Sequence, residues 1–343
     1  MKNRFSIISL GFGLVLVIML TVAAGAQSVQ KAPAPLFRDP VYDGAADPVV
    51  FWNQTEKNWW MLYTQRRANE ETADVAFCYG NEIGIASSSD NGKSWIYRGT
   101  LNLEFEHGKN TFWAPEVVFE NGKYHMFVVY IRGVRNHWGG DARMAHYTSE
   151  NCWDWSFEGL LTLSSDAVID ATLFKDENET WKMWYKDNSQ SWLAESKDLY
   201  TWTWRNEPII ADQAHEGPIV FEFGGFYWLI TDQWAGMGVY RSDDLENWKK
   251  QENPILTGAS NRPEDKPSGA HGCVVVENEQ AYIFYFTHPG RESHTKATLD
   301  AHGKYPINEK RSSIQVAELE VNNGILEVKD RDKPFHFFLP DKD

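Results

Sequence analysis

An aromatic-rich, strand-like segment recurs five times along the chain. Each copy is preceded, across a short turn of Asn, Gly, Asp or Glu, by another apolar run, so each unit contains a predicted β-hairpin. The five copies are WWMLYTQ from Trp59, YHMFVVY from Tyr124, WKMWYKD from Trp181, FYWLITD from Phe226 and AYIFYFT from Ala281. A repeat of this kind predicts an array of similar structural units that share one fold.

A third strand is predicted in every unit, and in four of the five it ends in a polar turn followed by Trp. Weaker fourth strands are expected around Ile96, Phe157 and Trp204, and the last unit is completed by residues 325–328 or by an N-terminal strand. No helical period of comparable length is present. The sequence therefore predicts an all-β fold, a single-domain five-bladed β-propeller over residues 36–343.

The first 26 residues have the composition of a secretory signal peptide. Two basic residues come first, an apolar stretch covers residues 7–22, and the small-residue triplet Ala-Gly-Ala ends the segment. With residues 27–35 as a linker, this predicts an exported protein, periplasmic or secreted, with no stable membrane insertion after cleavage. An uncleaved membrane anchor is the alternative.

Charge and cysteine content narrow the possible partners and chemistry. Without residues 1–26 the net charge changes from −15 to −17, which argues against duplex nucleic acid as a partner. Cys78, Cys152 and Cys273 are widely spaced, so the sequence predicts neither a disulfide framework nor a zinc site. The 16 Trp residues fit a propeller, where most would fill gaps between blades and some could stack on sugar rings.

Acidic residues recur at equivalent positions in the predicted blades. The first strand of each blade lies beside the propeller axis, so residues at the same end of these strands should converge. These residues are Asp47 in AADPVVF, Glu116 in WAPEVVF, Asp170 in VIDATLF, Glu216 in HEGPIVF and His271 in GAHGCVVV. Acids are depleted in strands and costly in an interior, so their recurrence indicates function. Ordinary turn or bulge residues beside Pro are the alternative.

Glu116 differs from the other acids in its spacing. It is closer to the Phe that follows it than the other acids are to theirs, and we expect it to turn away from the axis. Three acids therefore remain as predicted catalytic residues: Asp47, Asp170 and Glu216. Glycoside hydrolysis needs a proton donor and a carboxylate that activates water or attacks carbon, and a third acid nearby keeps the donor protonated.

Five short motifs, in order and at blade spacing, resemble glycoside hydrolase family 43, the five-bladed glycosidases that include arabinofuranosidases and xylosidases. They are DP after small residues, WAP, ID, EGP and Gly-x-His. The resemblance implies that Asp47 is the general base, that Asp170 orients the substrate and tunes pKa values, and that Glu216 is the general acid. It also implies an inverting reaction that requires no cofactor.

The resemblance adds two further expectations. His271 matches the position of an axial histidine near an ion or water, so a structural calcium near His271 is considered beside the alternative of a hydrogen-bonded channel histidine. Trp113 matches the aromatic residue of the WAP motif and is expected to form a wall of the sugar subsite.

Residues after the second strands should line the rim of the same face, because those strands return to it. The substrate-binding candidates there are Arg66, Arg67, Arg132, Lys186, Gln233, Trp234 and His288. Several cations at one mouth of an acidic chain suggest an anionic glycan, uronate-bearing or sulfated; solvated loop charges are the alternative. Long loops after Gln65 and His288 favour a pocket and exo action.

The predicted function is an exo-acting glycoside hydrolase that releases a terminal sugar from a plant or algal oligosaccharide or polysaccharide. One alternative is an enzyme that eliminates water or alcohol from a uronate, using Arg66, His271 and His288. The other is a glycan-binding propeller without catalysis, which would not need the three acids together. No Gly-x-Ser-x-Gly or His-Glu-x-x-His motif supports a serine or zinc mechanism.

Overall fold

The computed structural model describes residues 31–293 and 298–342. The predicted signal peptide and residues 27–30 of the predicted linker lie outside the described residues. Within them, the strands form five antiparallel sheets of four strands each, in the order of the sequence. The predicted five-bladed propeller is confirmed, with one domain, and the predicted hairpin forms the first two strands of each blade.

The blades have the following strands. Blade 1 contains β1 (Ala45–Asn53), β2 (Asn58–Gln65), β3 (Ile83–Ser88) and β4 (Ile96–Thr100). Blade 2 contains β5 (Thr111–Glu120), β6 (Lys123–Ile131), β7 (Arg143–Ser149) and β8 (Ser156–Leu160). Blade 3 contains β9 (Ile169–Lys175), β10 (Trp181–Asp187), β11 (Gln190–Ser196) and β12 (Thr203–Trp204). Blade 4 contains β13 (Glu216–Phe223), β14 (Phe226–Asp232), β15 (Met237–Ser242) and β16 (Lys249–Lys250). Blade 5 contains β17 (Ala270–Glu277), β18 (Gln280–Thr287), β19 (Ser313–Asn322) and β20 (Ile325–Val328).

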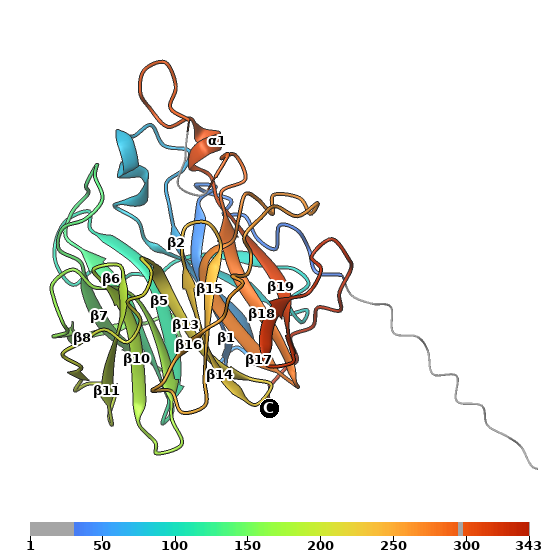
Figure 1. The fold of residues 1–343 in the computed structure, drawn as a ribbon. Coiled ribbons are helices and arrows are strands. Elements are labelled where there is room, and N and C mark those ends of the chain that lie inside the picture. The colour runs from blue at the N-terminus through green and yellow to red at the C-terminus, as the bar shows by residue number, and fades with distance from the viewer. Residues whose placement is uncertain (1–30, 294–297, 343) are drawn as a thin grey trace, which may run out of the picture.

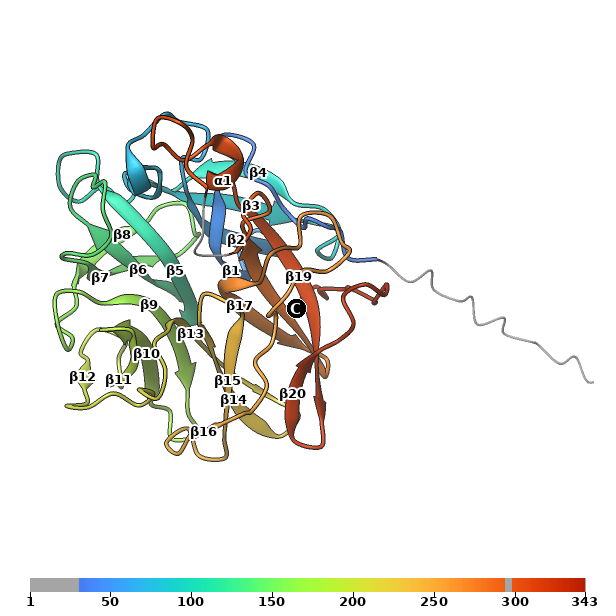
Figure 2. The same ribbon diagram turned by 45° about the horizontal axis from the view of Figure 1, so that its top comes forward.

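The first strands of the blades surround the centre of the molecule. β1, β5, β9, β13 and β17 contact one another in this order, and β17 closes the ring against β1. In Figure 2 they lie inside, and the later strands of each blade lie towards the periphery. Residues at the same end of these five strands therefore face a common axis, as the repeat predicts.

The repeated Ser-x-Asp turn and Trp have a structural role in the blades. In blade 3, Ser196 Oγ donates to Asp198 at 3.0 Å, and Asp198 accepts backbone N–H groups of the turn. Trp202 then donates its indole N–H to the carbonyl of Leu199 at 3.1 Å. Side-chain oxygens that accept turn amides stabilise such tight turns. These Trp residues thus belong to the scaffold.

Both ends of the described chain complete blade 5. β20 pairs with the second half of β19, whereas the N-terminal segment reaches the start of β19, where Ile314 N donates to Phe37 O at 2.9 Å. After β20 the chain continues to blade 1, where Phe337 and Leu339 are buried and Trp59 donates to Pro340 O at 2.9 Å. Residues 325–328 thus form the fourth strand of the blade, and the N-terminal segment adds an isolated bridge to β19 and not a strand.

Two loops project from one end of the propeller. The β2–β3 loop contains the short 3₁₀ helix η1 (Asp74–Cys78), and the β18–β19 loop contains α1 (Ile307–Lys310). Both helices lie at the top of Figure 1, and the Phe77 and Tyr305 rings are 6.1 Å apart. Lys310 donates to the carbonyl of Glu70 and so joins the loops.

Candidate functional site

Each inner strand has a break in register near its start. Asp47 and Asp170 lie in these breaks with φ of 48° and 57°, and Ala114 and Gly217 occupy the same place in blades 2 and 4 with φ of 43° and 56°. In blade 5 the extra residue is His271. A bulge with left-handed backbone re-aims its side chain, and such conformations cluster at functional sites.

Asp47 is held as a carboxylate. Its Oδ2 is 3.3 Å from Arg66 Nη2, and its Oδ1 is 3.5 Å from His271 Nδ1. Burial would raise the pKa of Asp47, but Arg66, His271 and a hydrogen bond from Thr64 outweigh burial and lower the pKa to about 2. Asp47 is therefore ionised at any pH at which an enzyme of this kind would work.

Asp170 occupies the equivalent place in blade 3 but has the opposite shift. Its Oδ2 accepts the backbone N–H of Gly217 at 3.1 Å. Burial, together with the nearby carboxylates of Glu216 and Asp47, raises the pKa of Asp170 to about 6 although His271 opposes this. The carboxyl of Asp170 thus gains a proton in the mildly acidic range.

Glu216 lies directly across the hairpin from a second acid, Asp232. Asp232 accepts N–H groups from Trp234 at 2.8 Å and His271 at 2.9 Å. Burial and the charge of Glu216 raise the pKa of Asp232 to about 7. Lys186 Nζ is 3.7 Å from Glu216 Oε2. We call Asp170, Glu216 and Asp232 the carboxyl cluster.

Asp232 is not among the candidate residues of the sequence analysis, and its place beside Glu216 was missed. The signal was available, because a hairpin whose first strand starts at Glu216 and whose second ends at Asp232 sets these residues opposite each other. Opposed side chains in an antiparallel pair are close neighbours.

His271 is buried on the axis among the acids. Burial would lower the pKa of His271, but the charges of Asp170, Asp47 and Asp232 outweigh it and raise the pKa to about 9. A Cβ on Gly217 would lie 2.4 Å from the imidazole Cδ2, so the glycine of EGP makes room for the ring. His271 is thus a cation that pairs with Asp47 near neutral pH.

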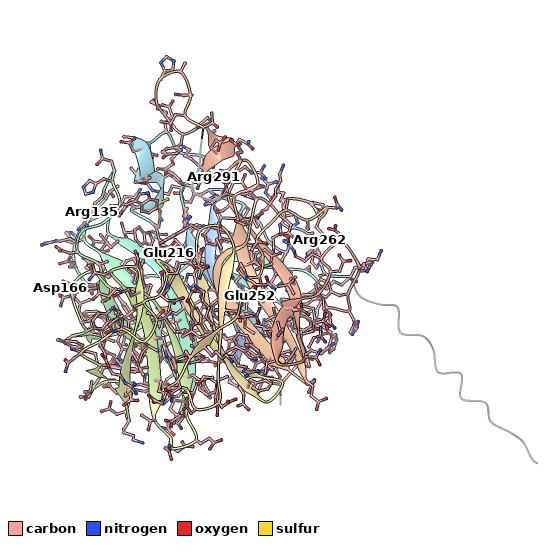
Figure 3. The ribbon with its side chains drawn as sticks, viewed as in Figure 1. Arg135, Asp166, Glu216, Glu252, Arg262 and Arg291 are labelled. Carbon is pink, nitrogen blue, oxygen red and sulfur yellow. The ribbon has the colours of Figure 1, made fainter. Side chains whose placement is uncertain are left out.

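Arg66 and His288 join Asp47 at the blade 1 side. Arg66 Nη1 is 3.5 Å from His288 Nε2, and its guanidinium lies 4.8 Å from the Phe286 ring centre. The charge of Arg291 also acts on Arg66 and Cys78, and Arg291 lies above Glu216 at the upper end of Figure 3. The structure therefore brings two guanidinium groups to the mouth of the site.

The other predicted rim residues separate into two groups. Lys186 and Trp234 are at the carboxyl cluster, and Gln233 follows Asp232 with its amide 3.5 Å from Thr231 Oγ1. Arg67 instead binds inside the η1 loop, to the carbonyls of Tyr79 and Ala76 and to Glu70. The exposed Arg132 pairs with Glu106 at 3.4 Å. Arg67 and Arg132 therefore make other contacts in the structure, and their predicted binding of substrate stays a prediction.

Trp113 lies on the rim in blade 2. It is the last paired residue before the bulge of β5, the place that Glu216 has in β13. Its indole N–H donates to Cys78 O at 2.6 Å and so ties β5 to the loop that begins at Arg66.

The expectation that Glu116 turns away from the axis was wrong. The bulge of β5 falls at Ala114 and Pro115, so Glu116 lies past the bulge and lines a cavity of about 190 Å³ that Asp47 and His271 also line. Its Oε1 accepts the N–H of Leu173 at 3.1 Å. Burial raises the pKa of Glu116 to about 7.

The described residues contain neither a metal-binding group nor a membrane-spanning helix. Among the described residues, no group of three or more His, Cys, Asp or Glu side chains could hold a metal ion, and His271 pairs with Asp47 as a cation. The calcium near His271 stays a prediction. No helix in the part of the chain that the structure describes is long and apolar enough to cross a bilayer.

Sequence comparison gives partial relatives. No family model matches the chain. A probable arabinan endo-1,5-α-L-arabinosidase A of Aspergillus clavatus is 29% identical over 169 residues, which cover 45% of this chain and 52% of that protein. The corresponding protein of Neosartorya fischeri is 27% identical over 169 residues. The chain spans about half the length of these curated relatives.

Structural comparison covers nearly the whole propeller. A thermostable family 43 glycoside hydrolase has a TM-score of 0.61 at 20% identity, with 89% of this chain and 98% of that chain covered. A family 43 β-1,3-galactosidase has a TM-score of 0.62 at 16% identity, with 85% and 95% covered. The resemblance read from the five motifs is confirmed in the structure: the chain has the five-bladed propeller fold of the family 43 glycoside hydrolases.

Proposed function

We propose that the protein is an inverting glycoside hydrolase. One observation carries the proposal: an ionised carboxylate, Asp47, faces the same axis as two acids of raised pKa, Asp170 at about 6 and Asp232 at about 7. Acid and base with separated proton affinities are what glycoside hydrolysis requires. The names of the family 43 neighbours and of the arabinosidase relatives support a carbohydrate substrate.

The residues have distinct proposed roles. Asp47 accepts a proton from the water that attacks the anomeric carbon, and Arg66 and His271 keep it ionised. Glu216 donates a proton to the leaving oxygen, and Asp232 and Asp170 beside it hold the shared protons. Asp170 orients the sugar, since its position is fixed by the N–H of Gly217. The proposal requires no cofactor.

We further propose exo action on an anionic glycan. The η1 and α1 loops contact each other over blades 1 and 5, which supports a pocket that is closed on that side. Arg66 and Arg291 gather positive charge there, and Arg66 Nε is buried without a hydrogen-bond partner among the described residues. A carboxylate or sulfate on the substrate would be attracted by these two guanidinium charges.

The test uses wild-type protein and two variants, Asp47→Asn and Glu216→Gln, with neutral and acidic plant and algal oligosaccharides. Products are followed by mass and near-ultraviolet absorbance. We expect release of a monosaccharide with one added water, and a loss of roughly 10²–10⁴-fold in each variant. Arg132→Gln, on the exposed rim, is the control and should keep full activity.

Other outcomes would identify the alternatives. A product lighter by one water, formed without Asp47 and Glu216, would mean elimination from a uronate. Binding without any turnover would mean a glycan-binding propeller. Cleavage within the chain, seen as oligosaccharide products, would contradict exo action but not hydrolysis. The anomer that NMR detects first after cleavage tests inversion.

Export is part of the proposal and has a separate test. The segment over residues 1–26 supports it by composition alone. Expression of the full chain, followed by fractionation and N-terminal sequencing, should give a mature protein that begins near Gln27. Retention of the full chain in the membrane fraction would favour the anchor.

A further inference from the structure

The rim of blade 2 exposes a large aromatic side chain. Trp138, in the loop between β6 and β7, is 60% exposed. A single exposed apolar residue is ordinary on a protein surface. Trp138 differs because it is the outermost of three contacting aromatic residues, and the other two are anchored beside the candidate site.

The three residues, Tyr79, Trp113 and Trp138, form what we call the aromatic cluster. Ring centres are 4.9 Å apart for Tyr79 and Trp113, 6.1 Å for Tyr79 and Trp138, and 6.2 Å for Trp113 and Trp138. The Tyr79 hydroxyl donates to His137 O at 2.9 Å, which fixes the backbone next to Trp138. The indole is therefore held in place while most of its surface meets solvent.

The β6–β7 loop, which carries Trp138, has two glycines with positive φ directly after this residue. Gly139 and Gly140 have φ of 92° and 90°, and Arg135 Nη1 donates to Gly139 O at 2.7 Å. A Cβ at Gly140 would lie 1.8 Å from Arg135 Nη1, so glycine is needed for this contact. Arg135 and Arg291 both lie above Glu216 in Figure 3, towards the end of the molecule from which the η1 and α1 loops project.

The aromatic cluster is connected to the proposed catalytic residues by short contacts. Trp113 donates to Cys78 O at 2.6 Å, and Cys78 ends η1 in the loop that starts at Arg66. Arg66 in turn contacts Asp47 at 3.3 Å. Trp138 thus lies one aromatic ring outward from Trp113, the predicted wall of the sugar subsite.

We propose that Trp138 forms a second sugar subsite, where a ring adjoining the one attacked at Asp47 and Glu216 stacks on the indole. The C–H face of a sugar ring is apolar and its hydroxyls point outward, so an exposed, fixed indole matches it. This inference rests on the proposed function, because it needs an oligosaccharide in the site. It makes Trp138 a specificity residue that does not touch the reacting atoms.

The test compares a substrate that fills one subsite with substrates that fill two or more. A glycosyl fluoride of the released sugar has no second ring, whereas the disaccharide and trisaccharide do. We expect Trp138→Ala to lower kcat/KM for the oligosaccharides by about 10-fold to 100-fold and to leave hydrolysis of the fluoride unchanged. Trp138→Phe should recover part of the loss.

Trp153→Ala is the matched control. Trp153 is 37% exposed in the β7–β8 turn at the other end of the same blade, and its loss should not alter the dependence on chain length. Thermal unfolding of each variant identifies any misfolded one. The subsite would be overturned if Trp138→Ala lowered kcat/KM equally for the fluoride and the oligosaccharides, or lowered it for neither.

Calorimetry separates this inference from the proposed function. Asp47→Asn protein should bind the trisaccharide. Adding Trp138→Ala should weaken that binding by about the same factor as it lowers kcat/KM for the oligosaccharides. If wild-type protein cleaves nothing but binding depends on Trp138, hydrolysis fails and the subsite stands. If no oligosaccharide that is tested binds or is cleaved, both fail.

Discussion

The blade 1 side and the blade 3–4 side of the site position a carboxyl group with the same backbone bulge but shift its pKa in opposite directions. Asp47 and Asp170 both lie in a bulge with positive φ at the start of an inner strand. Asp47 faces Arg66 and His271, and its pKa falls to about 2. Asp170 lies beside Glu216 and its pKa rises to about 6. The propeller thus sets the position of a carboxyl, and side chains from neighbouring blades set its charge.

The largest expected effect comes from removing the cation that distinguishes the two sides. In Arg66→Gln, Asp47 keeps only His271 as a charged partner, so its pKa should rise and the acidic limb of the pH–activity profile should move upward. We expect kcat/KM near neutral pH to fall about 100-fold, in line with loss of a positioned catalytic group.

Arg132→Gln provides the matched control, because its guanidinium is exposed and pairs only with Glu106 among the described residues. Wild-type activity in Arg66→Gln would show that Asp47 does not depend on this cation. An unchanged acidic limb with reduced activity would instead favour substrate binding as the main role of Arg66.

A second change concerns Glu116, a buried acid below the site. Its folded-state pKa of about 7 is above the ordinary value of 4.5, so the folded state holds this proton more tightly. The loss of folding stability that comes from ionising Glu116 in its buried place is therefore absent near pH 4. It grows as the pH rises towards 7 and reaches its full size above pH 7. Glu116→Gln should raise the free energy of unfolding at pH 8 by on the order of 2 kcal/mol, allowing for water in the cavity.

The measurement is chemical denaturation of both proteins at pH 4 and pH 8. Wild type and Glu116→Gln should have nearly the same free energy of unfolding at pH 4. Glu120→Gln is the control: the Glu120 carboxylate pairs with Lys175, so its removal should not raise the free energy of unfolding at pH 8. Equal stability of Glu116→Gln and wild type at pH 8 would mean that the cavity solvates the charge fully.

The smallest effect should follow from Asp232→Asn, which removes one acid from the carboxyl cluster. The remaining carboxylates repel one another less and release the shared protons at lower pH. The alkaline limb of the kcat/KM profile should therefore move down by about one pH unit, which is roughly a tenfold loss on that limb. An unchanged alkaline limb would mean that Asp232 supplies no charge to the cluster.

Much of this arrangement can be predicted from the sequence, because the blade repeat gives both the fold and the end at which the inner strands converge. Asp47, Asp170, Glu216 and Arg66 meet there as expected. The reason is that the side-chain positions follow from strand order and from the hairpin, and both are visible in the repeat.

The remaining features depend on details that a repeat does not encode. The bulge in β5 falls at Ala114 and Pro115, so Glu116 lies past its bulge, whereas Asp47 lies within the bulge of β1. Arg67 follows Arg66 directly but turns into the η1 loop, where backbone carbonyls bind it. Loop conformation of this kind is set by tertiary contacts.

The shared completion of blade 5 has a consequence for how the chain folds during synthesis. Blades 1 to 4 consist of consecutive strands, so each can form as it leaves the ribosome. The ring cannot close until the segment at Phe37 meets Ile314 and Phe337 packs against blade 1, which are contacts between the first and last parts of the described chain. We therefore expect a nascent chain stopped before residue 314 to remain protease-sensitive along both open edges, and resistance to appear only once the last blade is made.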